Sequence, residues 1–251
     1  MIDDELNFEP HDWMAWDSFQ SEADSFVRDV HMLVLIPLHA GISSLSQDTE
    51  VEMQKIEAFI EKASPENAER LAEDHANLCA ELADQERFLR NLSLVALFSR
   101  LTHALHKMAR TAETFAPINA KGYEGDNEFK KIWREYRERF GIDFGAKYIQ
   151  FIEPLRNARN MIVHNGGDAN EPIPITEIDF SKGDEGYCDP WFSKRYPQFV
   201  QDIGSLSARV RITEEQQNFA VESAIALVNR AAEQLRAKEL EAEKLRRSSQ
   251  K

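Results

Sequence analysis

The chain is poor in cysteine, in basic residues and in long apolar runs. Its two cysteines, Cys79 and Cys188, belong to no closely spaced Cys/His pattern. This predicts a reduced protein with neither a disulfide nor a structural zinc site. The 30 Lys and Arg residues are outnumbered by 44 Asp and Glu residues, which gives a formal net charge of -14. That balance argues against a protein that coats nucleic acid non-specifically, because such affinity comes from neutralising phosphates.

The sequence also has little that would direct it to a membrane. Its most apolar run, Met32 to Leu38, contains Pro37 and is too short to span a bilayer. The first 25 residues hold eight acids and no Lys or Arg, whereas a secretory signal begins with basic residues. We therefore expect a cytoplasmic protein without a membrane partner.

Helical periodicity dominates what is present, because apolar residues recur every three or four positions. The first helix carries Phe19, Ala23, Phe26, Val30 and Leu33 on one face, and Pro37 is expected to kink or end it. Ser64 and Pro65 predict the start of a polar helix that runs to about residue 83. The clearest apolar face then follows, on a predicted central helix, and consists of Phe88, Leu92, Val95, Phe98, Leu101, Leu105, Met108, Ala112 and Phe115.

The pattern changes over residues 168–212, which are rich in Pro, Gly and Asp. Alternating residues predict two short strands, one at Ile173 and Ile175 and one at Val210 and Ile212, as a small hairpin or edge pair. Residues 213–216 form a capping box that opens a long last helix. The fold class is therefore all-α, a helical bundle with a small two-stranded β insertion before the last helix. We expect a single domain over 1–251, with an N-terminal helical extension (1–84), a core (85–237) and a charged helical tail (238–251).

The candidate site lies at the end of a helix that starts near Phe144 and contains Pro154, where we expect a kink or a break. This helix delivers Arg159, Asn160 and His164. His164 follows Arg159 by five positions, so on an ideal helix the two side chains point about 140° apart. They can cooperate only if the helix ends between them, or if two copies of the chain meet across a dimer interface.

These residue types suit metal-independent cleavage of RNA. A histidine can move a proton at the ribose 2′-hydroxyl or at the leaving oxygen, and an arginine can hold the phosphate. We expect His164 to act as general acid/base, Arg159 as phosphate clamp and Asn160 as the orienting residue, with Arg156 assisting RNA binding. Residues 128–140 are predicted to form a short charged helix that ends at Gly141. The densest basic cluster lies on this helix and includes Lys130, Lys131 and Arg134. It is either a surface that tracks RNA or an ordinary solvated helix face.

An Arg-Asn pair followed by three residues and His, at the end of a helix in an all-helical chain, resembles the HEPN superfamily. The resemblance covers the motif helix and the last helix well, residues 85–237 loosely, and the first 84 residues hardly at all. It implies a helical bundle that forms a homodimer, with two motifs facing each other to make one endoribonuclease site without metal or cofactor. Many members are toxins or antiviral defence effectors, which implies an RNA substrate and an antitoxin or defence-system partner protein. Other members are inactive and serve as dimerisation or protein-binding modules.

Simpler interpretations of the same residues stay open. The helix dipole favours Arg and His at any helix C-terminus, so the motif residues could simply stabilise the end of a helix. His103 and His106 have a spacing that can place two ligands on one metal, although no third ligand is identifiable and a polar helix edge is the simpler interpretation. A third function is an antitoxin or immunity protein that neutralises a basic toxin through its acidic surface.

Overall fold

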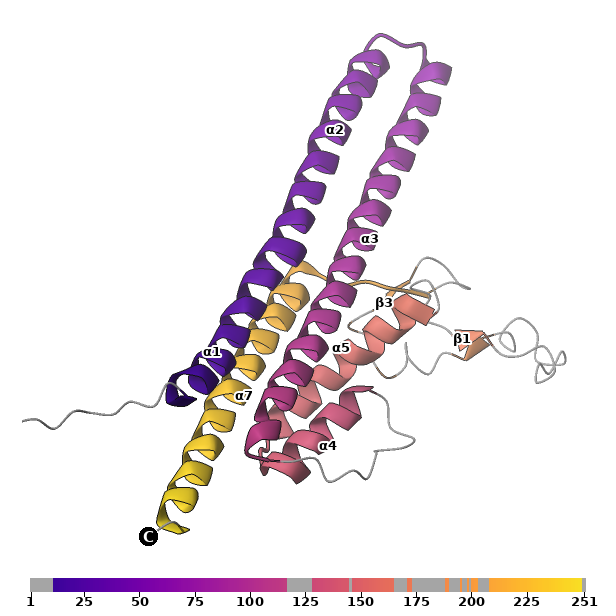
Figure 1. Cartoon of the computed structure of the whole chain (residues 1–251). Coiled ribbons are helices and arrows are strands. Elements are labelled where there is room, and N and C mark those ends of the chain that lie inside the picture. The colour runs from indigo at the N-terminus through magenta and orange to yellow at the C-terminus, as the bar shows by residue number, and fades with distance from the viewer. Residues whose placement is uncertain are drawn as a thin grey trace, which may run out of the picture. The chain divides into compact units, whose positions relative to one another are not determined.

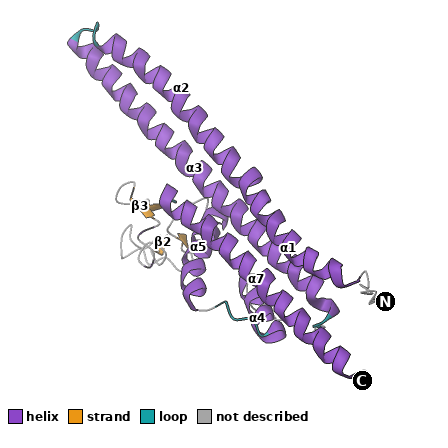
Figure 2. Cartoon of the chain, turned by 90° about the vertical axis from the view of Figure 1, so that its left-hand side faces the viewer, coloured by secondary structure: helices purple, strands orange, loops and turns teal. Residues whose placement is uncertain are grey.

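The computed structural model describes residues 11–116, 128–144, 146–164, 171–172, 188–189, 195, 198, 200–202 and 208–249. Helices dominate this part of the chain, which confirms the predicted all-α class (Figure 2). They are α1 (His11–Val30), the π-helical η1 (His31–Leu35), α2 (Ile36–Ile60), α3 (Pro65–Thr111), the 3-10 turn η2 (Ala112–Thr114), α4 (Glu128–Phe140), α5 (Ala146–His164) and α7 (Glu214–Ser249). The strands are β1 (Glu171–Pro172), β2 (Cys188–Asp189), β3 (Val200–Asp202) and β4 (Ala208–Val210).

Spatial contacts divide the chain into two compact units. Unit 1 comprises Met1–Val30, Leu97–Ile152 and Val221–Lys251, and unit 2 comprises His31–Ala96 and Glu153–Ala220. The helices α3, α5 and α7 each contribute residues to both units, so the units are interleaved along the chain. The predicted boundary at 84/85 coincides with no helix end, because α3 runs through it.

Unit 1 is a helical bundle whose core is aliphatic and aromatic. Its helices each place an apolar face inside, as burial of apolar surface requires. The buried side chains include Phe19, Phe26, Leu101, Leu105, Met108, Ile132, Tyr136, Phe144, Leu227, Val228 and Leu235. Ion pairs of Lys107 with Glu22 and of Arg100 with Asp29 join α3 to α1 at the rim of this core.

The last turn of α4 shows how one residue ends a helix. Gly141 has φ 62°, a left-handed conformation that glycine adopts without a side-chain clash. The chain then turns back, and the Ile142 N–H donates to the Tyr136 carbonyl at 3.0 Å. The predicted end of this helix at Gly141 is confirmed, and Ile142 and Phe144 return to the core.

Unit 2 contains a helical hairpin, which we define as α2 together with residues 65–89 of α3. The two helices run side by side and are joined by the turn at 61–64 (Figure 1). Beyond the hairpin, Leu94, Leu155, Ala158, Met161 and Ile212 are buried in this unit.

Polar side chains are also buried in unit 2, and they have partners. Gln217 donates from Nε2 to Ser93 Oγ at 2.6 Å, and Asn91 donates from Nδ2 to the Val210 carbonyl at 3.0 Å. These bonds tie α3 to the start of α7 and to β4. A buried polar group that lacks a hydrogen bond is costly, so the bonds also fix the register of these elements.

The predicted kink or end at Pro37 corresponds to an interruption of the regular α-helix, because the π-helical η1 separates α1 from α2 and Pro37 lies in the first turn of α2. Two other expectations over the first 115 residues are wrong. One extra residue in a π turn shifts the helix face, and Val34 is therefore buried in place of the expected Leu33. The helices expected to about 83 and from about 88 are one helix of 47 residues, which begins at Pro65 as predicted.

The predicted apolar face of the central helix is confirmed from Phe98 to Ala112 but wrong at its start. Phe88 and Leu92 are exposed, whereas Asn91 and Leu94 are buried. Leu94 and Asn91 lie four and seven residues before Phe98, so they share its helix face, and there Asn91 donates a hydrogen bond to the Val210 carbonyl.

The β insertion lies before the last helix, as predicted, but its pairing differs. Within the described residues, β4 pairs antiparallel with β3, and β1 pairs antiparallel with β2. The predicted strand at Ile173 and Ile175 lies outside the described residues. Val210 thus finds its partner in Val200, because a strand only ten residues away closes a shorter loop.

Two further predicted helical segments are continuous. Pro154 lies inside α5, which continues to His164 without a break. The predicted charged helical tail is part of α7, which is helical to Ser249. Glu239 is buried there and accepts a 2.7 Å bond from Arg236, which helps to explain why the helix persists.

Candidate functional site

The second half of α5 carries the motif, and its apolar residues decide which face is free. Leu155, Ala158 and Met161 recur every three positions and are buried in unit 2. On an ideal helix they occupy an arc of about 120°. The opposite arc, which we call the free arc, therefore holds the residues that remain available for chemistry.

All the predicted motif residues lie on that free arc. Counted at about 100° per residue, Arg156, Arg159, Asn160 and His164 fall within about 140° of one another. Arg156, Arg159 and Asn160 are half-buried, and His164 is exposed at the last position of the helix. Val163 lies among them and is 45% exposed, as are several other large apolar side chains on these helices.

One contact links two of the predicted catalytic residues. Arg159 donates from Nη1 to Asn160 Oδ1 at 3.0 Å. Arg156 makes the same kind of bond to its own neighbour, from Nη2 to Asn157 Oδ1 at 3.0 Å. Each guanidinium is thereby oriented along the helix surface by an adjacent amide, a geometry that suits bidentate binding of a phosphate.

Within one chain, Arg159 and His164 mark the two edges of the free arc. The first condition for their cooperation, a helix end between them, is not met, because α5 is helical through His164. Within a single copy, the described motif residues are therefore spread over about 140° of the helix surface. The second condition, a meeting of two copies, remains the geometry in which these side chains would converge. The expected cap at 165–167 lies outside the described residues.

The predicted RNA-binding residues of α4 belong to unit 1, whereas the motif belongs to unit 2. Lys131 and Arg134 are exposed, and the side chain of Lys130 lies outside the described part. Arg139, from the same cluster, is occupied by the fold, since it bonds Glu135 at 2.7 Å and the Ala116 carbonyl at 2.7 Å. The outer residues of α4 thus remain candidates for RNA contact.

A metal site finds no support among the described residues. No group of three or more His, Cys, Asp or Glu side chains that could hold a metal ion occurs in the part of the chain that the structure describes. His103 is exposed and His106 is half-buried on the same helix.

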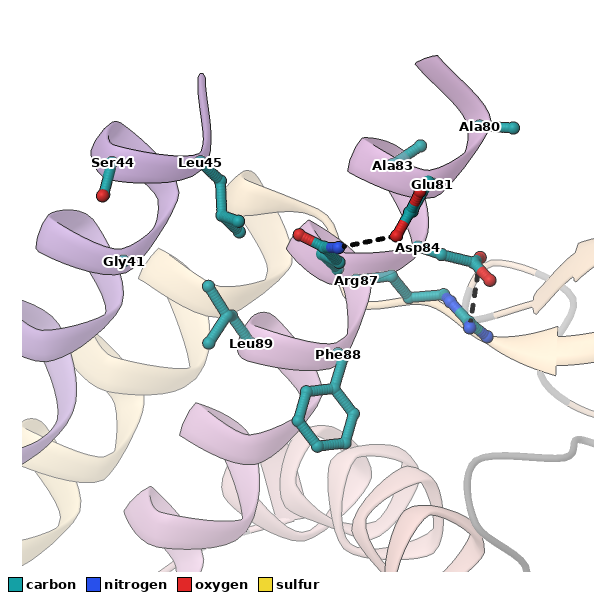
Figure 3. Close-up of a pocket in the computed structure, with 11 residues that line it drawn as sticks. Gly41, Ser44, Leu45, Ala80, Glu81, Ala83, Asp84, Arg87, Phe88 and Leu89 are labelled. Atoms are coloured by element: carbon teal, nitrogen blue, oxygen red, sulfur yellow. Dashed lines mark hydrogen bonds and ion pairs between the residues drawn. The ribbon is translucent and has the colours of Figure 1, made fainter. Parts of the chain in front are cut away.

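The hairpin contains a hollow that the sequence did not indicate. Its volume is about 1020 Å³, and it is lined from α2 by Gly41, Ser44 and Leu45 and from α3 by residues between Ala80 and Leu89. Leu45 and Leu89 extend from the two helices into the space between them (Figure 3). The close approach at Gly41 explains part of this shape, because a Cβ there would lie 3.0 Å from Leu89 Cδ1.

Charged groups edge the hollow on the α3 side. Asp84 is shared by two arginines, at 3.2 Å from Arg87 and 3.3 Å from Arg209. Burial lowers the pKa of the Arg87 guanidinium, and Asp84 opposes that effect. Glu81, at the same edge, accepts a 3.3 Å bond from Gln85 Nε2.

By length and composition alone, one helical stretch of the described residues, Ser18–Ile60, could cross a membrane. The core helix of a soluble protein passes the same test. Only 22% of its most apolar 18 residues are buried, and Met32, Leu33 and Ile36 are exposed.

Comparisons with protein-family models, with curated proteins and with solved structures found no match to this chain. The resemblance to the HEPN superfamily therefore rests on the residues of the motif and their helical setting.

Proposed function

We propose that this protein is a metal-independent endoribonuclease that works as a homodimer, with the free arcs of two α5 helices facing each other. The observation that carries the proposal is the position of Arg156, Arg159, Asn160 and His164 on one free arc, opposite the buried Leu155, Ala158 and Met161.

The chemistry needs two proton transfers and one anion clamp. In the dimer, one His164 accepts the proton of the ribose 2′-hydroxyl, whose oxygen attacks the phosphorus. The other His164 protonates the departing 5′-oxygen, so the products carry a 2′,3′-cyclic phosphate and a 5′-hydroxyl. Arg159 binds the non-bridging oxygens, and its bond to Asn160 holds it ready for that role.

Dimerisation supplies what one copy lacks. Arg159 and His164 of one helix diverge, whereas two antiparallel helices would bring the arginine of each near the histidine of the other. The exposed Val163 lies in the middle of the arc and would be covered by the same contact. Arg156 would add to RNA binding beside the motif, and Lys130, Lys131 and Arg134 on α4 are separate candidates for RNA contact in a cytoplasmic protein.

The second candidate is an inactive HEPN-like module that dimerises or binds a protein partner. The observation that favours it is the continuous helix through His164, on which Arg159 and His164 of a single copy point apart.

The deciding experiment incubates total cellular RNA and tRNA with purified protein in EDTA. We expect the wild type to cut RNA, and Arg159→Ala and His164→Ala each to lose at least about 100-fold in rate, as the loss of a general acid/base predicts. The matched controls are Arg70→Ala and His39→Ala, which remove the same side-chain types from exposed hairpin positions. They should cut at the wild-type rate.

Two results would contradict the proposal. Equal cleavage by wild type and His164→Ala would exclude the mechanism. Absence of cleavage by the wild type over a range of RNAs would favour the inactive module.

A further inference from the structure

The hairpin buries very little of its own surface. Every residue from 36 to 89 is described, and of these only Leu38 and Thr49 are buried. Ordering each residue costs about 1–2 kcal/mol of conformational entropy, and the little surface that these two helices bury against each other offsets only a small part of that cost.

The seam between the two helices has the spacing of a coiled coil. On α2 the seam positions follow one another by four or three residues, and they are Leu38, Ile42, Leu45, Thr49, Met53, Ile56 and Ile60. On α3 they are Ala68, Leu71, His75, Leu78, Leu82, Glu86 and Leu89. All but Leu38 and Thr49 are only half-buried, so much of the seam remains accessible. A third helix laid on it would complete the burial.

The hollow provides space for the side chains of such a third helix. It is lined by Leu45 and Leu89, and the neighbouring Phe88 is 60% exposed. Helix-binding grooves take apolar side chains spaced at three, four and seven residues, and this hollow has the size and the lining for one such set.

The net charge of the hairpin indicates which class of partner can bind in the hollow. Residues 36–89 hold 12 acidic and 4 basic residues, a formal net charge of -8. A second copy of the hairpin would bring a like charge against it, and an anionic membrane surface would be repelled in the same way. A helix with one apolar face and basic flanks is complementary to the hairpin both in its apolar hollow and in its negative charge.

We propose that the hairpin is a docking site for a basic amphipathic helix of a partner protein, whose apolar face enters the hollow while a basic side chain lies against Glu81. This interaction surface is separate from the motif on α5 and does not depend on its activity.

The test uses the full chain and a labelled synthetic peptide of roughly 18 residues, five helical turns, built from Leu on one face and Lys on the other. Fluorescence anisotropy measures its dissociation constant. A peptide of the same composition in scrambled order and a Leu/Glu peptide with the same apolar face are the ligand controls. We expect the amphipathic Leu/Lys peptide to bind at least about tenfold more tightly than either control.

Two pairs of variants locate the site on the hairpin. Phe88→Ser and Glu81→Lys should each weaken binding about tenfold, because they remove an apolar wall and reverse the charge of the hollow. Phe59→Ser and Glu61→Lys are matched controls at the far end of the hairpin, where Phe59 is 64% exposed. They should change the dissociation constant less than about twofold, since Glu61 lies further from the hollow than a Debye length of about 10 Å.

Three outcomes would overturn the inference. Equal binding of the scrambled peptide would mean that charge alone acts. Equal losses in Phe88→Ser and Phe59→Ser would place the binding elsewhere. Binding to phosphatidylglycerol vesicles, without binding to the peptide, would assign the hairpin to a membrane.

Discussion

Tyr136 lies at the centre of unit 1 and combines ring packing with one buried hydrogen bond. Its ring centroid is 5.4 Å from that of Phe140 and 5.1 Å from that of Phe144. Its hydroxyl donates to the Leu105 carbonyl at 2.9 Å, which ties α4 to α3. Burial raises the pKa of the Tyr136 hydroxyl far above its ordinary value of about 10, because the phenolate would lose its hydration.

Tyr136→Phe should lower the free energy of unfolding at pH 7 by about 1 kcal/mol, the usual net value of one hydrogen bond. The pH dependence has a definite sign. Below pH ~10 the hydroxyl is neutral in both states, and the contribution of Tyr136 is complete. Above pH ~10 the unfolded chain releases this proton and the folded protein keeps it, so wild-type stability falls by up to about 1.4 kcal/mol per pH unit.

Urea unfolding of both proteins from pH 7 to pH 11 checks this prediction. The difference in unfolding free energy between wild type and Tyr136→Phe should shrink above pH ~10 and then change sign. A difference that stays constant over this range would show that Tyr136 ionises equally in both states.

At the scale of the element, α7 begins as its sequence predicts. Gln216 N–H donates to Thr213 Oγ1 at 3.2 Å, and Thr213 N–H donates to Gln216 Oε1 at 3.0 Å. This reciprocal pair is the predicted capping box, and it satisfies two N–H groups that the helix itself leaves unpaired. Local hydrogen bonds of this kind depend on four consecutive residues only, so the sequence is sufficient to predict them.

Thr213→Ala should therefore lower the free energy of unfolding by about 1 kcal/mol, the typical cost of a lost N-cap. Thr102→Ala is the matched control, because the Thr102 hydroxyl bonds only to carbonyls of its own helix, those of Phe98 and Ser99. Alanine has the higher helix propensity, so the control should be neutral or slightly stabilising. Equal losses in both variants, measured by thermal unfolding, would contradict a capping role for Thr213.

The long helices were harder to predict from the sequence. The polar face of residues 65–83 and the apolar face from Phe88 onward indicate two helices, yet α3 is continuous. A change in the apolar pattern along a helix records a change of neighbours, and it does not require a break in the backbone. Likewise, the π turn at His31–Leu35 accommodates the ring of Pro37 and its missing N–H, which a regular helix could accommodate only with a kink.

At the scale of the whole molecule, the proposed function requires two copies. Two copies of a chain with a net charge of -14 repel each other, so self-association requires a local surface without that negative charge. The free arc of α5 is such a surface, because Val163 lies there between two arginines and a histidine. Val163→Asp should therefore convert a dimer to a monomer in sedimentation-velocity experiments and abolish RNA cleavage.

Val51→Asp is the control for that variant, because Val51 is 52% exposed on the hairpin and lies away from the motif. It should sediment and cut RNA as the wild type does. A wild type that cuts RNA as a monomer at every concentration would disprove the dimeric site.

The sequence by itself determined the all-α class, the starts of α3 and α7, the end of α4 and most of the buried face of α1, because periodicity, capping residues and a left-handed glycine act within a few residues. It also singled out Arg159, Asn160 and His164. The tertiary structure decided which side of each helix is inward: Val34 in place of Leu33, Leu94 in place of Leu92, and the motif on the free arc of α5. Those choices depend on partners distant in the sequence, such as Val210 for Asn91, and no local pattern encodes them. The hollow between Leu45 and Leu89 arises in the same way, from two helices that meet only once the chain has folded back at residues 61–64.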